Sequence, residues 1–336
     1  MAERSSSQSP DWSTARTLQV MKIQRISVPT PFKVGPVNVY LIEEDPLTLI
    51  DTGPFTREAI AALRDGLSRL GHGLHAIKRV VLTHAHADHF GLARVVAEAS
   101  GADVFVHEWD APMVSGPDDR TVFKGLLASA GVPQEAIDRI DLGSGRYRKY
   151  EQRLDSVQTL KDQDEIVFDR ESLVVVHTPG HTPGSICLLR ASSRLVVSGD
   201  TILKNITPNP VLNPDPIDPA RRFQSLGEYL VSLARVKSIA PTVLKGGHGD
   251  DVADYDEYFN RLYQFTRARQ SKLLSLLPRD GATAWDASHK LFPGAKGENR
   301  FLALSETIAH LDFAVSEGKL SSRKEGAAEV YHAPFG

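Results

Sequence analysis

The sequence is notable first for what it has little of. Its 336 residues include one cysteine, Cys187, so an internal disulfide is excluded. No apolar run approaches the roughly 20 residues that a membrane-spanning helix needs. Lys and Arg number 39 and Asp and Glu 42, which gives a net charge of −3 and no overall attraction to nucleic acid or to an anionic membrane. The first residues are polar and lack the apolar segment of a secretory signal, so we expect a cytoplasmic protein.

Two common hydrolase and nucleotide-binding signatures are also missing. We find no Gly-x-Ser-x-Gly elbow, which would present a nucleophilic serine, and no Gly-rich P-loop, which would hold a phosphate. Serine hydrolases and P-loop enzymes therefore have no support in this sequence.

The pattern of apolar residues predicts an α/β layered fold followed by a helical tail. Residues 1–19 are rich in Ser, Gln and Pro and are expected to form a flexible tail. Across 20–250 strand-like runs alternate with helix-like segments, beginning with a hairpin over 37–51, and the later part is mostly β. This order suits two facing sheets with helices outside. Within it, 108–160 is less regular, and its short helical segments could form a cap over a site. Residues 251–336 are helical in pattern, with a strand pair near the end.

A cluster of histidines stands directly after one of the apolar runs. The segment VVLTHAHADHFG (80–91) contains His84, His86, Asp88 and His89 within six positions. Imidazole and carboxylate are ligands that suit zinc, iron or manganese. Because alternate residues of an extended turn can point the same way, His84 and His86 could share one metal, while Asp88 and His89 face a second. Two adjacent metals need about six to eight protein ligands, so others must come from elsewhere in the chain.

Three further candidate ligands occur in comparable contexts. His181 lies in TPGHTPGS, Asp200 ends the segment RLVVSGD, and His248 lies in TVLKGGHG. Each follows an apolar run and has glycine nearby, where a loop can leave a sheet and turn sharply. The sequence therefore predicts that strand ends bring these side chains to the histidine cluster.

With these four blocks in this order, the sequence resembles the metallo-β-lactamase superfamily over roughly residues 20–250. The segment LIDTG at 49–53 is also similar to an early strand and turn of that family. The resemblance implies an α/β fold, the αββα sandwich, followed by a small C-terminal helical, winged-helix-like domain over 251–336.

The resemblance also implies how seven ligands are divided between two divalent metal ions, with zinc favoured and iron or manganese as alternatives. The first metal would be bound by His84, His86 and His181, the second by Asp88, His89 and His248, and Asp200 would bridge both. Two such cations lower the pKa of a bridging water, so that hydroxide exists at neutral pH, and they polarise a carbonyl or phosphoryl oxygen. Asp88 is the catalytic candidate, because it could orient the nucleophile or carry a proton to the leaving group. Asp51 matches no ligand position and is expected to support the site through hydrogen bonds.

Four residues are weaker candidates for contacting a substrate. Arg146 and Arg148 lie in the basic, tyrosine-containing segment GSGRYRKYEQR, and arginine suits carboxylate or phosphate groups. Lys204 and Asn205 follow the expected bridging carboxylate closely and could line the mouth of a pocket. For all four, an ordinary solvated surface position is the competing interpretation.

The helical tail gives no sign of nucleic-acid binding. Between residues 251 and 336 there are 12 acidic and 11 basic residues, a net charge of −1, whereas a DNA-reading module needs a basic stripe. We interpret the tail as a packing element, a homodimer contact or one wall of the substrate pocket.

The leading functional hypothesis is a binuclear metal-dependent hydrolase that acts on a small-molecule ester or thioester. The blocks TPGHTPGS and SGD look more like the glyoxalase II and lactonase side of the superfamily than the antibiotic-degrading side. A lactonase and an RNA phosphodiesterase are the alternatives, because some relatives with a short helical tail cleave RNA. A di-iron redox protein, a mononuclear iron dioxygenase and a non-catalytic binding protein fit less well, since the ligand set is complete and no flavin-binding part is recognisable.

Overall fold

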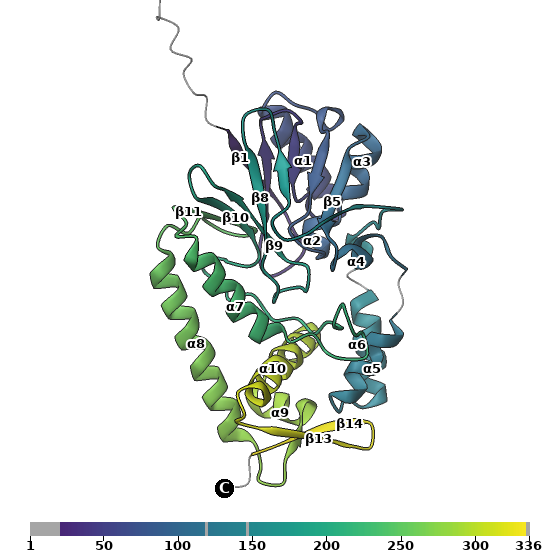
Figure 1. Cartoon of the computed structure of the whole chain (residues 1–336). Coiled ribbons are helices and arrows are strands. Elements are labelled where there is room, and N and C mark those ends of the chain that lie inside the picture. The colour runs from purple at the N-terminus through teal and green to yellow at the C-terminus, as the bar shows by residue number, and fades with distance from the viewer. Residues whose placement is uncertain (1–20, 118–119, 146–147, 334–336) are drawn as a thin grey trace, which may run out of the picture.

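The computed structural model describes residues 21–117, 120–145 and 148–333. The predicted flexible tail, 1–19, and Arg146 lie outside these residues. Figure 1 shows two packed sheets with helices on their outer faces, and a mainly helical unit below them. Among the described residues no helix is long and apolar enough to cross a membrane.

The first sheet carries the N-terminal half of the sandwich. Its strands lie side by side in sequence order. The pairs β1–β2 and β2–β3 are antiparallel, and the pairs from β3 to β6 are parallel. The strands are β1 (Ile23–Val28), β2 (Val37–Ile42), β3 (Thr48–Ile50), β4 (Arg79–Val81), β5 (Asp103–His107) and β6 (Gln158–Leu160). The antiparallel pairing of β2 with β3 confirms the predicted hairpin.

The second sheet has five strands and faces the first. Its spatial order is β11-β10-β9-β8-β7, and only β10 and β11 pair in parallel. The strands are β7 (Glu165–Val167), β8 (Ser172–His177), β9 (Ile186–Arg190), β10 (Leu195–Gly199) and β11 (Val243–Gly246). Helix α7 (Ser225–Ser238) separates β10 from β11 in the chain, because a parallel pair needs a long connection.

Helices make up most of the regular structure outside these two sheets. The helix α1 begins after Thr56, whose side chain accepts a hydrogen bond from the Ala59 backbone. The α-helices are α1 (Arg57–Arg69), α2 (Ala87–Phe90), α3 (Ala93–Ser100), α4 (Ala111–Ser115), α5 (Thr121–Ser129), α6 (Gln134–Gly145), α7 (Ser225–Ser238), α8 (Tyr255–Leu276), α9 (Ala284–Leu291) and α10 (Glu298–Ser316). Two short 3₁₀ helices are η1 (Leu74–Ala76) and η2 (Arg148–Tyr150).

Strand β2 shows how the sequence builds the layers. All six of its residues are buried, because both faces of the sheet are covered. Val39 and Leu41 pack in the core beneath α1 and α3, whereas Tyr40 and Ile42 pack in the core between the two sheets. Side chains of a strand alternate between its faces, so one apolar run serves both cores.

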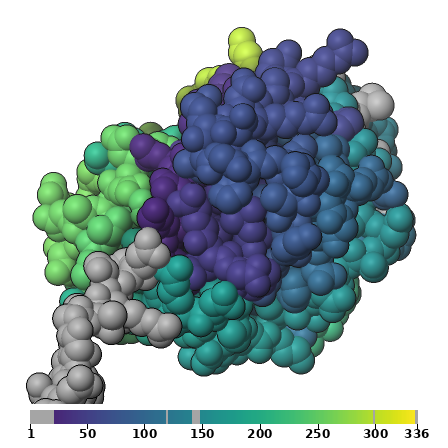
Figure 2. Space-filling model, turned by 90° about the horizontal axis from the view of Figure 1, so that it is seen from above, coloured from purple at the N-terminus to yellow at the C-terminus, as the bar shows by residue number. Residues whose placement is uncertain are grey.

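The second sheet is covered on its outer side by α7 and the beginning of α8. Cys187 and Val196 of the sheet share a core with Leu233 of α7 and Tyr258 of α8. This completes four layers, helix, sheet, sheet and helix, and confirms the predicted αββα sandwich. Figure 2 looks down on the end away from the lower unit, where purple and blue residues of the N-terminal half fill the centre of the visible surface.

The lower unit is formed by the C-terminal helices together with part of 108–160. Leu127 of α5, Ile137 of α6, Leu273 of α8 and Leu304 of α10 belong to one hydrophobic core. A small sheet completes the unit, with β12 (Ala282–Thr283) pairing with β14 (Ala328–His332), which pairs with β13 (Ser321–Glu325). We call α5, α6 and residues 255–333 the C-terminal unit.

The predicted elements of the C-terminal unit agree with this arrangement except in one strand. The strand pair near the end is confirmed as β13 and β14, but β12 was not predicted because two residues carry no readable alternation. Helix α8 is shared, since Tyr258 packs on the sandwich and Leu273 in the C-terminal unit. The division of the chain at residue 250 stays a prediction.

Candidate metal centre

The seven predicted ligands come from loops at one edge of the two sheets. His84 and His86 follow β4, and Asp88 and His89 lie in the single turn of α2. The other three ligands follow strands of the second sheet, which are His181 between β8 and β9, Asp200 after β10 and His248 after β11. Because the sheets face each other, these loop ends meet as the sequence predicts.

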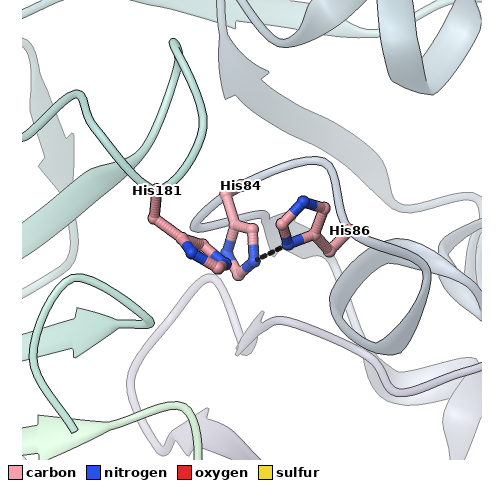
Figure 3. A group of neighbouring side chains, drawn as sticks. All are labelled: His84, His86 and His181. Atoms are coloured by element: carbon pink, nitrogen blue, oxygen red, sulfur yellow. Dashed lines mark hydrogen bonds between the residues drawn. The ribbon is translucent and has the colours of Figure 1, made fainter. Parts of the chain in front are cut away.

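Three histidines form the first group. The Nε2 atom of His84 lies 3.1 Å from Nδ1 of His86. The ring of His181 lies against both, with centroid distances of 4.9 Å and 4.6 Å. Figure 3 shows the three rings pointing toward one another, with the dashed line joining His84 and His86. One ring nitrogen from each of the three lies within 4.8 Å of those of the others, close enough for one metal ion.

Asp88, His89 and His248 form the second group, and their ligand atoms also lie within 4.8 Å of one another. The Nε2 atom of His248 is 3.4 Å from Oδ2 of Asp88. The side chains of His89 and His248 are almost fully buried, whereas that of Asp88 is 13% exposed. This carboxylate is therefore the member of the group that an incoming molecule can reach.

Asp200 lies between the two groups. Its Oδ1 is 3.4 Å from Nε2 of His89, and its Oδ2 is 3.7 Å from Nε2 of His181 and 3.6 Å from Nε2 of His248. A carboxylate within 4 Å of histidines from both groups is suitably placed to bind to two metals at once.

The donors fit a pair of divalent metal ions on their own chemistry. Among the described residues, buried side-chain atoms without a hydrogen-bond partner include Nε2 of His89, His181 and His248 and Oδ1 of Asp200. Four such atoms facing one small volume would carry a desolvation cost unless something binds them. Imidazole nitrogen and carboxylate oxygen are the ligands of zinc, iron and manganese sites.

The two groups differ in the protonation of their histidines. Burial and the neighbouring imidazoles lower the pKa of His84 well below its usual value and that of His86 to about 3, so both rings are neutral at physiological pH and can coordinate. Burial opposes protonation of His89, but the carboxylates of Asp200 and Asp51 outweigh it and raise its pKa well above the usual value. Burial likewise opposes ionisation of Asp200, but His89 and its neighbours hold the pKa of this carboxyl well below its usual range. Asp200 and Asp51 thus stabilise positive charge at the second group, and a metal that binds there must displace the proton of His89.

Asp51 supports the segment that contains His84 and His89 through hydrogen bonds. One carboxylate oxygen accepts the backbone N–H of Thr83 at 2.8 Å, and the other accepts the Thr83 hydroxyl and lies 2.8 Å from Nδ1 of His89. The Thr83 hydroxyl in turn contacts Nδ1 of His84 at 3.0 Å. Asp51 is buried and has φ of 60°, a left-handed conformation that few side chains tolerate. The contacts agree with the support role expected for this residue.

Asp110, a residue that the sequence did not single out, also holds the ligand loops. Asp110, in the loop after β5, accepts the backbone N–H of Ala85 at 2.8 Å, that of Gly184 at 2.7 Å and the hydroxyl of Thr182 at 2.7 Å. It therefore ties the loop of His84 to that of His181. The available signal was its position just past an apolar strand, the same context as the ligands.

Gly247 packs directly against the centre. A Cβ atom at this position would collide with the carboxylate of Asp200 and with the ring of His89 at 2.7 Å. The glycine beside His248 is thus required by the close approach of the backbone to two ligands, which a motif search alone does not reveal.

The candidate substrate-binding residues are spread more widely. The Nζ atom of Lys204 lies 3.2 Å from a carboxylate oxygen of Asp250, and the Lys204 carbonyl accepts a hydrogen bond from Arg261 of α8. Lys204 and Asn205 line a hollow of about 310 Å³ together with residues of α8. Arg148 begins η2, whose Tyr150 carbonyl accepts from the Phe55 backbone. Contact of these residues with a substrate stays a prediction.

Comparison with known proteins agrees with the geometry. The family model described as Metallo-beta-lactamase superfamily matches residues 32–248, which include all seven candidate ligands. The chain belongs to the metallo-beta-lactamase superfamily. The resemblance inferred from the His-x-His-x-Asp-His segment is therefore confirmed at the level of the superfamily, and the glyoxalase II or lactonase branch stays a prediction.

Relatives and solved structures extend the match beyond the metallo-beta-lactamase part. The chain is 32% identical over 308 residues to a probable metallo-hydrolase, YqjP, of Bacillus subtilis, covering 90% of this chain and 94% of that one. The crystal structure of a metallo-beta-lactamase family protein from Thermus thermophilus superposes with a TM-score of 0.78 at 28% identity, over 93% of this chain and 98% of that one. A beta-lactamase domain protein from Burkholderia ambifaria, at 20% identity and TM-score 0.76, covers 93% and 92% and shows the same fold.

Proposed function

We propose that this chain is a binuclear metal-dependent hydrolase whose substrate is a small-molecule ester or thioester. The observation that carries the proposal is the convergence of two ligand groups on one carboxylate, Asp200, within 4 Å of histidines from both. An arrangement that binds one metal would have no need of the second set of three donors.

Two divalent cations, zinc foremost, would supply a water of lowered pKa and polarise the oxygen of the scissile group. The chain's own residues would do the rest. His84, His86 and His181 would hold one cation, and Asp88, His89 and His248 would hold the other. The partly exposed carboxylate of Asp88 is suited to accept a proton from the attacking water and return it to the leaving group.

The preference for a small ester over RNA rests on charge. The whole chain has a net charge of −3, and the part from 251 to 336 has a net charge of −1. A protein that holds an RNA backbone gains most of its affinity from Lys and Arg contacts with phosphate. We therefore propose that the substrate is a small molecule. We also propose that the protein acts in the cytoplasm.

The test combines metal content with a substrate panel. Protein purified without added metal is analysed by elemental mass spectrometry and assayed with thioesters, simple esters, lactones and short RNAs. We expect close to two metal ions per chain and turnover of a thioester or ester far above the others. The paired replacement His84→Ala and His86→Ala should remove activity, and His75→Ala, at an exposed histidine, is the matched control.

Each departure from this result has a definite meaning. Preferred opening of lactones would move the protein to the lactonase side, and preferred cleavage of RNA would overturn the choice of a small substrate. One iron per chain, with oxygen consumption and no hydrolysis, would overturn the hydrolase proposal altogether.

A further inference from the structure

The ligand His181 has a ring partner that lies outside its own loop. Its Nδ1 atom is 3.1 Å from the backbone carbonyl of Asn209. Donation of this N–H fixes the ring and leaves Nε2 free to coordinate a metal. Asn209 belongs to the segment between β10 and α7, and we call its residues 206–224 the β10–α7 loop.

The β10–α7 loop is attached to the C-terminal unit at its first half. The Asn209 side chain donates a hydrogen bond to the backbone carbonyl of Leu302 in α10, at 3.3 Å. Three residues later, Leu212 is 4% exposed and belongs to the hydrophobic core of the C-terminal unit rather than to any core of the sandwich. Asn209, whose carbonyl orients His181, is thus held in place by the C-terminal unit.

The second half of the loop is attached through one partly buried arginine, Arg222. The guanidinium of Arg222 donates to both carboxylate oxygens of Asp312 in α10, at 3.0 Å and 2.8 Å, and to the hydroxyl of Tyr331 in β14 at 2.7 Å. It also reaches Ser129 of α5 at 3.3 Å and forms an ion pair with Glu329. Its side chain is 10% exposed, so these bonds are shielded from water and the planar fork fixes the loop in one geometry.

The two ends of this loop are joined by bonds of their own. Phe223 donates its backbone N–H to the Asn213 carbonyl at 3.0 Å, and Ser225, at the start of α7, donates its hydroxyl to the Val211 carbonyl at 3.0 Å. Pro214 and Arg222 face each other in an isolated β-bridge. A displacement of Arg222 would therefore be passed to the segment that contains Asn209.

The other ligand histidines have their Nδ1 partners within the sandwich, and that of His86 is the ring of His84. His84 contacts Thr83, His89 contacts Asp51, and Nδ1 of His248 is 2.9 Å from the carbonyl of Pro36. These partners lie in or beside the first sheet. Among these ligands of the described chain, His181 is the one whose orientation depends on the C-terminal unit.

From this contrast we propose that Asn209 and Arg222 are positioning residues through which the C-terminal unit fixes His181 and so sets the metal affinity of the first group. The inference rests on the proposed function, since it requires that the two groups bind metal. It gives the C-terminal unit a role in the centre that needs no contact with substrate. Loosening the loop should weaken the group of His84, His86 and His181 and spare that of Asp88, His89 and His248.

The test measures zinc affinity group by group. Wild type, Arg222→Met and Asn209→Ala are titrated with zinc against a competing chelator, while the ring nitrogens of His181 and His248 are followed by NMR to assign each step. Arg221→Met, at an exposed neighbouring arginine, is the matched control. Complete loss of an outer hydrogen-bond partner lowers metal affinity by about 10-fold to 100-fold. These variants loosen the Asn209 carbonyl without removing it, so we expect a loss of up to about 10-fold for the step that shifts His181 and less than 2-fold for the other.

The possible results separate the inference from the proposed function. A selective loss at His181 in both variants, with Arg221→Met like wild type, supports the inference. Unchanged affinities, or an equal loss at both groups that follows a lowered melting temperature, would overturn it, because the loop would then only stabilise the fold. Wild-type protein that binds fewer than two zinc ions would instead overturn the binuclear proposal itself. Asn209→Ala removes only one exposed hydrogen bond and should fold. It therefore still tests the inference if Arg222→Met does not fold.

Discussion

Replacing Asp51 by asparagine exchanges one oxygen for an NH₂ group at a position that contacts Thr83, which supports His84 of the first group, and His89 of the second group. In the native protein the Asp51 carboxylate accepts hydrogen bonds from the backbone N–H and the hydroxyl of Thr83. One of its oxygens lies 2.8 Å from Nδ1 of His89. Asparagine also tolerates the left-handed φ of 60°, so the backbone should be retained. The substitution therefore perturbs the electrostatics and hydrogen bonding of the centre with little change of shape.

The expected effect on metal affinity depends on which ring nitrogen of His89 carries the proton. A carboxylate favours the tautomer with N–H at Nδ1, which leaves Nε2 free for metal. An NH₂ group facing Nδ1 favours the opposite tautomer, with the proton on the coordinating nitrogen. Changes of this kind lower metal affinity by about 10-fold to 100-fold, which corresponds to about 1.4–2.8 kcal/mol at the group of Asp88, His89 and His248.

Asp51→Ala should be more damaging, and in a different way. It leaves three buried donors without an acceptor, at about 1–3 kcal/mol each, and puts a Cβ-bearing residue without a polar side chain into the left-handed region, at about 1–2 kcal/mol. The sum is a large part of the roughly 5–15 kcal/mol by which a domain is stable. We expect a soluble Asp51→Asn protein with weakened metal binding, and an Asp51→Ala protein that melts far earlier or does not fold.

The assay is zinc affinity by chelator competition, with circular dichroism melts of the metal-free proteins. Asp155→Asn, at a carboxylate that is 87% exposed, is the control for loss of one negative charge. If Asp51→Asn bound both zinc ions as tightly as wild type and Asp155→Asn, the idea that Asp51 sets the tautomer of His89 would be refuted.

Four further outcomes are expected. His84→Ala combined with His86→Ala should abolish zinc binding at the first group while the circular dichroism spectrum is retained, and unchanged metal content would contradict the ligand assignment. Asp200→Ala should lower the occupancy of both metals in elemental analysis, and loss at one group alone would argue against a bridge. Burial raises the pKa of the Cys187 thiol to about 11, so at pH 8 it is protonated and a thiol reagent should modify it only after unfolding; rapid modification of the native protein would contradict its burial. In a filter-binding or anisotropy assay the protein should bind generic DNA weakly, and tight, salt-sensitive binding would refute our interpretation of residues 251–336.

The sequence alone was sufficient to predict the layers of the sandwich and the seven side chains that gather at the candidate metal centre. His84, His86, Asp88 and His89 are adjacent in the chain, so their proximity needs no tertiary information. His181, Asp200 and His248 each follow an apolar strand, and strand ends of packed sheets gather at a common edge. Strands such as β2 are recognisable because burial on both faces favours apolar residues at nearly every position, with Asn38 as the exception in β2.

Only the tertiary structure revealed which residues hold these ligands in place and where the segment 108–160 packs. Asp110 binds Ala85 and Gly184, which are 25 and 74 residues away, and Asn209 offers His181 a backbone carbonyl, a group that every residue has. Neither contact leaves a local pattern in the sequence. The helices α5 and α6 were readable as helices, but their burial against α8 and α10 depends on which apolar faces meet after the chain has folded back. Local propensity and strand periodicity specify elements and their ends, whereas pairings between distant segments depend on packing of the whole chain.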